Sequence, residues 1–170
     1  MINASKISLR FFEPADAERL AFLANNKKIW LNLRDGFPHP YTLDDAREFI
    51  ERNNNSNPQT VFAILYEGDL CGAIGIFKME DVYRKSAEIG YWIAEPYWGK
   101  GIASESVSRI VEFGFKELDI VRIYAGIFSN NTASQRVIEK NGFIKEAVLK
   151  NAVYKNNALL DEVRYAILKK

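Results

Sequence analysis

The chain has 170 residues, 48% of them hydrophobic, and its 23 lysines and arginines nearly balance 22 aspartates and glutamates, leaving a net charge of +1. This length predicts one domain, residues 1–170, that buries roughly 70% of the surface its unfolded chain would expose. A near-neutral chain with mixed charges gives no reason to expect a nucleic acid or a membrane surface as partner.

The single cysteine and single histidine narrow the chemistry further. Cys71 and His39 are too few for a disulfide framework or a Cys/His zinc site, so no metal is expected. The first ten residues lack the apolar core of a signal peptide, and no apolar run approaches the ~20 residues of a membrane helix. A reducing cytoplasm is therefore the expected compartment.

The first third of the chain predicts one strand followed by two helices. Residues 7–12 alternate between apolar and polar side chains, which is typical of a strand. Residues 14–24 open with a proline and carry apolar side chains at helical spacing. After an irregular stretch at residues 25–41, Thr42 is a suitable N-cap for a helix that ends near Arg52.

The middle of the chain predicts three strands and a long helix. Residues 60–66 and 70–79 are rich in β-forming residues and are joined by a glycine turn, which indicates a hairpin. Residues 88–94 form a further strand. Residues 99–118 carry apolar side chains on one helical face and predict a helix.

The remaining residues predict a strand, a helix and a closing hairpin. Residues 121–128 are a β-branched and aromatic run, as in a buried strand. A helix capped near Asn131 ends at the Asn-Gly pair 141–142, and residues 143–154 and 158–168 then pair as a hairpin. The order β-α-α-β-β-β-α-β-α-β-β, without repeats or linkers, predicts a single mixed α/β domain.

Residues 88–107 carry most of the recognisable chemistry. Gly99 and Gly101 keep side chains away from a turn that opens a helix, and the unpaired amides of that helix end bind anions, most often phosphate. Glu88, on the strand that leads to the turn, is a candidate proton acceptor. Together they indicate an enzyme with a phosphorylated co-substrate. The turn lacks the Gly-Lys-Ser/Thr of a Walker motif and follows three strands, which fits a dinucleotide fingerprint badly.

This pattern resembles the GNAT superfamily of acyl-coenzyme-A-dependent N-acetyltransferases. The resemblance covers nearly the whole chain in element order and is sharpest at residues 88–104 and 131–143. Segments 34–42 and 161–167 look most like the branch that acetylates the N-termini of ribosomal proteins. The resemblance implies a mixed α+β domain in which a central mixed seven-stranded sheet is flanked by about four helices. Homodimers are frequent in this family, so a homodimer is expected as well.

The resemblance also implies acetyl-CoA as co-substrate. Its pyrophosphate is expected on the backbone amides of the glycine turn: Trp98, Gly99, Lys100, Gly101, Ile102 and Ala103. Trp98 replaces the usual Gln or Arg, a change that a cradle of main-chain groups tolerates. Ser104 adds a hydroxyl contact. The pantetheine arm is expected along four further residues: Trp92, Ile93, Ala94 and Asn131.

Glu88 matches the family's catalytic glutamate and is the implied base, acting through a water molecule. Its apolar neighbours argue against the alternative of an ordinary solvent-facing glutamate. The family's usual acid is a tyrosine at the position of Ile138, so the ribosomal-protein branch implies Ser134 instead. Asn131 and Ser134 could equally serve only to cap their helix. The N–H of Ile93 is the expected oxyanion donor.

Three functions are consistent with the sequence. The first is acetyl transfer to a primary amine, with a protein N-terminus as the first acceptor considered. The second keeps the enzyme but replaces the acceptor with an amino acid, a polyamine or an antibiotic. The third is an acyl-CoA-binding sensor without catalysis, suggested only by Ile138. Trp30, Phe37 and Tyr41 either line the acceptor pocket or pack in the core.

Overall fold

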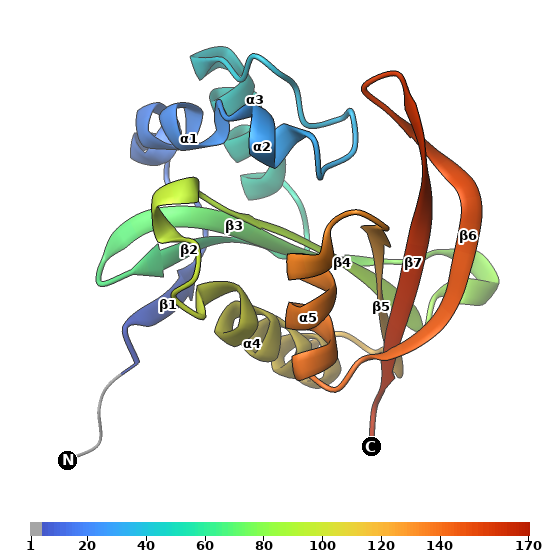
Figure 1. The fold of residues 1–170 in the computed structure, drawn as a ribbon. Coiled ribbons are helices and arrows are strands. Elements are labelled where there is room, and N and C mark those ends of the chain that lie inside the picture. The colour runs from blue at the N-terminus through green and yellow to red at the C-terminus, as the bar shows by residue number, and fades with distance from the viewer. Residues whose placement is uncertain (1–4) are drawn as a thin grey trace.

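The computed structural model describes residues 5–170, and Figure 1 shows a single sheet running through them. The strands are β1 (Ile7–Arg10), β2 (Val61–Tyr66), β3 (Asp69–Lys78), β4 (Ser86–Ile93), β5 (Arg122–Phe128), β6 (Ile144–Lys155) and β7 (Ala158–Leu168). The α-helices are α1 (Ala17–Ala24), α2 (Lys27–Trp30), α3 (Leu43–Asn54), α4 (Ile102–Glu117) and α5 (Thr132–Lys140). Residues 1–4, part of the segment assessed above for a signal peptide, lie outside this range.

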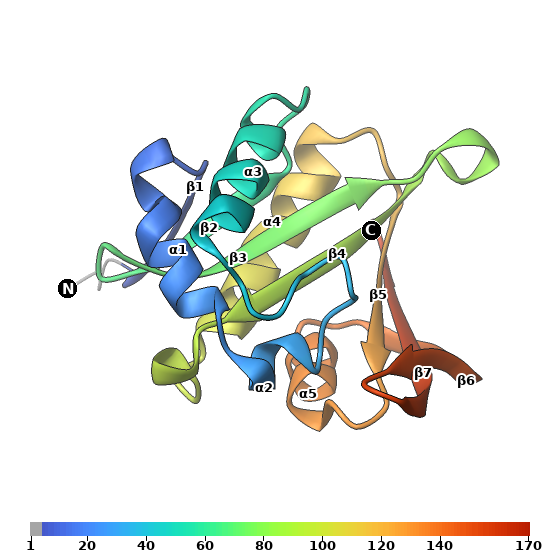
Figure 2. The same cartoon turned by 90° about the horizontal axis from the view of Figure 1, so that it is seen from above.

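The sheet has seven strands in the order β1-β2-β3-β4-β5-β7-β6. All neighbours are antiparallel except β4 and β5, which run parallel over only three residue pairs, the last of them Glu88 with Tyr124. Beyond that pair β4 bonds only to β3, and β5 bonds only to β7. The two central strands therefore diverge after Glu88 and open the middle of the sheet, as seen from above in Figure 2.

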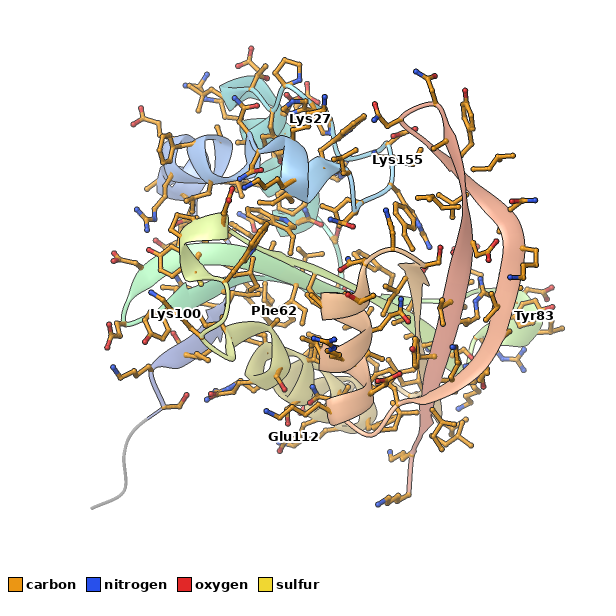
Figure 3. The ribbon with its side chains drawn as sticks, viewed as in Figure 1. Lys27, Phe62, Tyr83, Lys100, Glu112 and Lys155 are labelled. Carbon is orange, nitrogen blue, oxygen red and sulfur yellow. The ribbon has the colours of Figure 1, made fainter. Side chains whose placement is uncertain are left out.

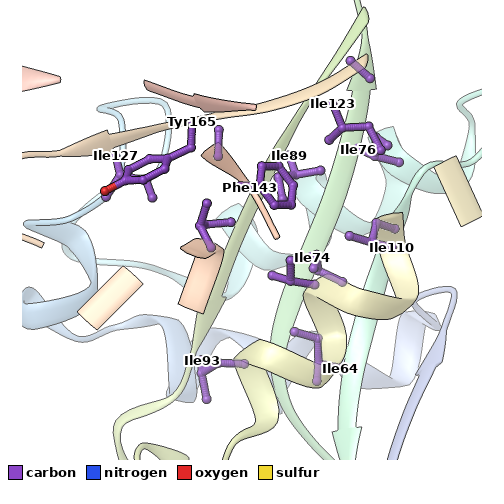
Figure 4. Packing of buried hydrophobic residues seen from close by; sticks show 14 of the residues in the cluster. Ile64, Ile74, Ile76, Ile89, Ile93, Ile110, Ile123, Ile127, Phe143 and Tyr165 are labelled. Carbon is purple, nitrogen blue, oxygen red and sulfur yellow. The ribbon is translucent and has the colours of Figure 1, made fainter. Parts of the chain in front are cut away.

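Each face of the sheet is covered by its own group of helices. Helices α1, α2 and α3 lie on one face, whereas α4 and α5 lie on the other (Figure 1). The core beneath α4 and α5 is built mainly from isoleucines, many of which Figure 4 shows packed together. Side chains along β4 alternate between the faces: Trp92 packs toward α3, and Ile93 toward α4. This alternation decides which β4 side chains share a pocket.

The structure confirms the predicted fold class and the order of the predicted elements. The described residues contain five α-helices rather than about four, because α2 forms within a stretch predicted to be irregular. The Asn26 side chain caps it by accepting a hydrogen bond from Lys28 N at 2.8 Å, and the buried Ile29 anchors it. Within residues 5–170, no helix is both long enough and apolar enough to span a bilayer.

Candidate active site

The glycine turn leads directly into the longest helix. A short 3-10 helix, Glu95–Tyr97, follows β4, and the chain then turns at Gly99 (φ 74°) and Gly101 (φ 76°) before α4 begins at Ile102. A side chain favours neither φ, so glycine is the residue that suits both positions. The helix therefore begins at Ile102, later than the sequence predicted. Apart from the glycine itself and its two chain neighbours, no atom of the described residues lies within 4 Å of a Cβ built on either glycine.

Six consecutive amides of this turn lack a partner. The backbone N–H groups from Gly99 to Ser104 find no acceptor among residues 5–170, and the first paired amide of the helix is that of Glu105, bonded to Gly101 O at 3.2 Å. A 16-residue helix adds the positive end of its dipole at the same place. Free donors, a positive dipole end and open space together make an anion cradle that fits a diphosphate.

Trp98 takes part in the turn through its side chain. Its amide is bonded to Glu95 O at 3.1 Å, so it belongs to the predicted cradle by position but has no free donor. Its indole Nε1 donates to Ile93 O at 2.7 Å and ties the turn to the end of β4. Beside the turn, Lys100 (labelled in Figure 3) places its ammonium 5.3 Å from the ring centres of both Tyr66 and Tyr97.

The end of β4 offers backbone groups to the gap between the central strands. Ala94 N donates to Cys71 O at 2.8 Å, and hydrogen bonds alternate along an antiparallel pair. The N–H and C=O groups of Tyr91 and Ile93 therefore face away from β3. Of the three residues predicted on this strand, Ile93 faces the gap, whereas the backbone of Trp92 and Ala94 is directed to β3. Tyr91 is the neighbour that sequence reasoning missed.

Glu88 lies at the point where β4 and β5 part, on the face covered by α1 to α3. Its side chain is 16% exposed and forms an ion pair with Arg34, which comes from the loop after α2. The Arg34 guanidinium binds Oε1, and no group in residues 5–170 donates to Oε2. Burial and the Glu88 carboxylate raise the pKa of the neighbouring Tyr124 phenol. One carboxylate oxygen of Glu88 is thus free to accept a proton.

Ser134 approaches the gap from the opposite face. It lies in the first turn of α5, where the Asn131 side chain caps the helix by accepting from Ser134 N at 3.2 Å. The Ser134 Oγ lies 2.7 Å from the hydroxyl of Tyr91, whose pKa burial raises to about 12. The expected capping role of Asn131 is present, and Ser134 has a phenol partner besides. Ile138, at the family's tyrosine position, is fully buried in the core.

A partly open space of about 300 Å³ lies beside Glu88. Its floor is formed by β3, β4 and β5, and the loop at residues 32–37 covers it. Apolar side chains make up most of its wall: Phe37, Phe49, Val61, Phe77, Trp92 and Phe128. Of the three aromatic residues that were expected either to line an acceptor pocket or to pack in the core, Phe37 lines this space. Tyr41 is buried with its ring centre 4.9 Å from that of Phe37, and Trp30 lies 3.8 Å from Lys155 Nζ.

The sequence matches the family described as acetyltransferase (GNAT) domain over residues 6–144. The chain belongs to the GNAT acetyltransferase family. It is accordingly an N-acetyltransferase of the kind that uses acetyl-CoA. Among curated proteins it is 35% identical to the putative ribosomal N-acetyltransferase YdaF of Bacillus subtilis, an alignment that covers 96% of this chain and 92% of that protein.

Two solved structures extend the similarity to ligand-bound relatives. RimL, a ribosomal L7/L12 alpha-N-protein acetyltransferase in complex with coenzyme A, is 25% identical with a TM-score of 0.86, over 97% of this chain and 95% of RimL. The microcin C7 self-immunity acetyltransferase MccE, in complex with acetyl-CoA and AMP, is 27% identical with a TM-score of 0.83, over 98% of this chain and 94% of MccE. The GNAT fold thus extends across almost the whole chain.

Proposed function

We propose that this GNAT enzyme moves an acetyl group from acetyl-CoA to a primary amine, with the α-amine of a protein N-terminus as the first acceptor class. One observation carries the proposal: Glu88 lies on β4 where that strand parts from β5, and the chain that leaves the other end of β4 carries six unpaired amides at residues 99–104. The similarity to a ribosomal L7/L12 acetyltransferase supports the choice of acceptor.

The main chain is proposed to hold most of the co-substrate. The amides of the turn, from Gly99 to Ser104, would hold the pyrophosphate. The free backbone groups of Tyr91 and the free N–H of Ile93 would hold the pantetheine arm, with Asn131 on the other wall. When bound, acetyl-CoA supplies a thioester that the acceptor amine attacks directly, releasing a thiol. The Ile93 N–H is our proposed donor to the carbonyl oxygen during that attack.

Glu88 is the proposed general base, receiving the amine proton through a water molecule at its unpaired Oε2. An α-amine titrates near ~7.8, so an appreciable fraction is already neutral at physiological pH, whereas a lysine near ~10.4 is neutral only about once in a thousand molecules. A mild base is therefore sufficient for an N-terminal acceptor. General base catalysis of this kind contributes roughly 10²- to 10⁴-fold in rate.

Ser134 is the proposed proton donor to the departing sulfur. On the α5 side of the gap, the Ser134 hydroxyl lies 2.7 Å from the hydroxyl of Tyr91, within hydrogen-bond distance. Because its pKa is raised to about 12, Tyr91 keeps its proton at physiological pH and can hold the Ser134 hydroxyl in place. Tyr91 acts through Ser134 and is therefore a positioning residue.

Thiol release in the presence of acetyl-CoA tests this function. The acceptors are N-terminal peptides beside amino acids, a polyamine and an aminoglycoside, each given to the wild type and to Glu88→Gln. We expect rapid release with at least one peptide and a large loss in the variant. Turnover confined to small amines would show that the acceptor is a small amine and not a protein N-terminus. Coenzyme A binding without turnover on any amine would overturn the proposed reaction.

A further inference from the structure

Three adjacent strands carry glycine in the floor of the space beside Glu88. Gly75 on β3 and Gly90 on β4 are paired in register, and Gly126 follows on β5. A Cβ built on Gly90 would meet only the Phe77 ring, at 3.9 Å, so that a larger side chain would project into the space. None of the three has a positive φ. Their absent side chains therefore do not serve the backbone conformation. At Gly75 the Phe77 ring takes the place of a side chain, 2.6 Å from a Cβ built there, and at Gly126 the Glu162 carboxylate does so at 2.8 Å. Gly90 is the one of the three that leaves open volume.

The residues that line this space carry almost no net charge. Arg34 and Glu88 are the only charged lining residues, and they pair with each other. A further carboxylate, that of Glu162, lies over Gly126, but the Arg164 guanidinium already binds it at 2.7 and 3.2 Å. An acceptor with several ammonium groups, such as a polyamine or an aminoglycoside, would leave its additional charges without partners in an apolar surrounding.

Size and lining together indicate what fits. A cavity of about 150 Å³ lined by apolar side chains is sufficient to bind benzene. The space here is about 300 Å³, and four phenylalanines and one tryptophan contribute to its wall. It therefore has room for a large aliphatic or aromatic side chain. The free Oε2 of Glu88 lies in the same wall, where the amine next to such a side chain would meet it.

We propose that the acceptor of this enzyme is a primary amine carried on a large apolar group, and that this group occupies the space over Gly90 beside Glu88. A peptide that begins with Leu, Met or Phe has this chemistry, and so does a small aromatic amine. The inference rests on the proposed acetyl transfer and narrows its acceptor. Each lost methylene in such a pocket lowers kcat/KM by roughly tenfold or more.

A panel of peptides that differ only in their first residue tests this proposal, with thiol release from acetyl-CoA as the readout. The first residues are Phe, Leu, Met, Ser, Gly and Asp, and spermidine and 2-phenylethylamine are added. We expect kcat/KM for Phe and Leu to exceed that for Gly by about tenfold or more. The ratio of kcat/KM for the Phe peptide to kcat/KM for 2-phenylethylamine tells whether a peptide or a free amine is preferred.

The outcomes separate the two claims. Transfer with equal rates for all peptides, or with spermidine as the preferred acceptor, overturns this inference and leaves the acetyltransferase proposal in place. Coenzyme A binding without transfer to any of the amines overturns the proposed function, and the inference falls with it.

A substitution that enlarges a residue in the floor of this space provides a second test. Gly90→Val places two methyl groups where the side chain of the acceptor is expected, and Gly90→Ala is the milder change if valine disturbs the strand. We expect the ratio of kcat/KM for the Phe peptide to kcat/KM for the Gly peptide to fall at least about tenfold in Gly90→Val.

Ser86→Val is the matched control, because Ser86 lies on the same strand but outside the lining, and it should keep the wild-type ratio. The dissociation constant for coenzyme A reports whether each variant is folded. An unchanged preference in a folded Gly90→Val contradicts the proposal.

Discussion

The proposed donor side and the proposed acceptor side of this enzyme are built from different parts of the chain. The donor side is a continuous stretch, residues 99–104, whose working groups are main-chain amides. The acceptor side combines side chains from α3, β2, β3, β4, β5 and the loop after α2. A site made of main chain tolerates an unusual side chain such as Trp98, whereas a site made of side chains changes its specificity with single substitutions. In the proposed site, local backbone geometry would fix the co-substrate, and packing between distant segments would fix the acceptor.

The largest effect is expected on the acceptor side, at Glu88. Glu88→Gln keeps the shape of the side chain but removes the base, so kcat/KM should fall about 10²- to 10⁴-fold. The dissociation constant for coenzyme A, measured by calorimetry, should stay unchanged because Glu88 is not part of the cradle. Glu146→Gln, which also removes a carboxylate from an arginine pair, is the control and should retain full activity. Full activity in Glu88→Gln would exclude Glu88 as base.

The donor side should respond at Gly101. In Gly101→Ala, a left-handed φ costs about 1–2 kcal/mol, and relaxation of that strain turns the free amides away from the cradle. Coenzyme A should bind about 5- to 30-fold more weakly. Gly68→Ala carries the same kind of strain in the β2–β3 turn, where φ is 93°, and also has open space around its Cβ. The free energy of unfolding, measured in urea, should fall by a similar amount in both variants, and only Gly101→Ala should bind coenzyme A more weakly. Equal affinities would contradict the main-chain cradle.

A smaller effect is expected at Tyr91, between the two sides. Tyr91→Phe removes the phenol that holds Ser134, and the loss of one hydrogen bond, about 1 kcal/mol, lowers kcat by up to about tenfold without changing coenzyme A affinity. In a Ser134→Ala background the same change should have no further effect.

Tyr165→Phe is the matched control for Tyr91→Phe. Tyr165 is also buried, has its pKa raised to about 12, and bonds to α5 through Glu139 at 2.8 Å. Its hydroxyl bonds to Gln135 and Glu139 but not to Ser134, so its substitution should lower stability and leave kcat unchanged. Similar kcat losses in both tyrosine variants would show that Tyr91 only supports the fold.

The smallest effect is expected at Lys155, which holds the loop over the acceptor space. Its buried ammonium lies 3.8 Å from the Trp30 ring and 2.7 Å from Asp35, at the place where Figure 3 shows it next to the loop after α2. Lys155→Met loosens that loop, so the acceptor KM should rise about two- to fivefold with unchanged coenzyme A affinity. Lys150→Met removes an exposed pair with Asp161 on the same hairpin and should change neither value.

The same contrast explains what could be predicted from sequence. Periodicity and glycine positions located every strand and the glycine turn, because each of these signals lies within a few consecutive residues. Helix α2 was missed, since only Asn26 and the buried Ile29 mark it. Arg34 and Tyr91 were assigned no role, although the absence of a tyrosine at position 138 was a reason to search for another. Their partners are 54 and 43 residues away, and contacts of that separation depend on the divergence of β4 and β5.

Amide hydrogen exchange of residues 99–104, measured without and with saturating coenzyme A, tests the central claim most directly. Unpaired amides should exchange rapidly in the free enzyme, and all six should become strongly protected when coenzyme A binds, whereas the already bonded amide of Trp98 should change much less. Protection of this turn in the free enzyme, or coenzyme A binding that leaves its amides exchanging as before, would contradict a main-chain phosphate cradle.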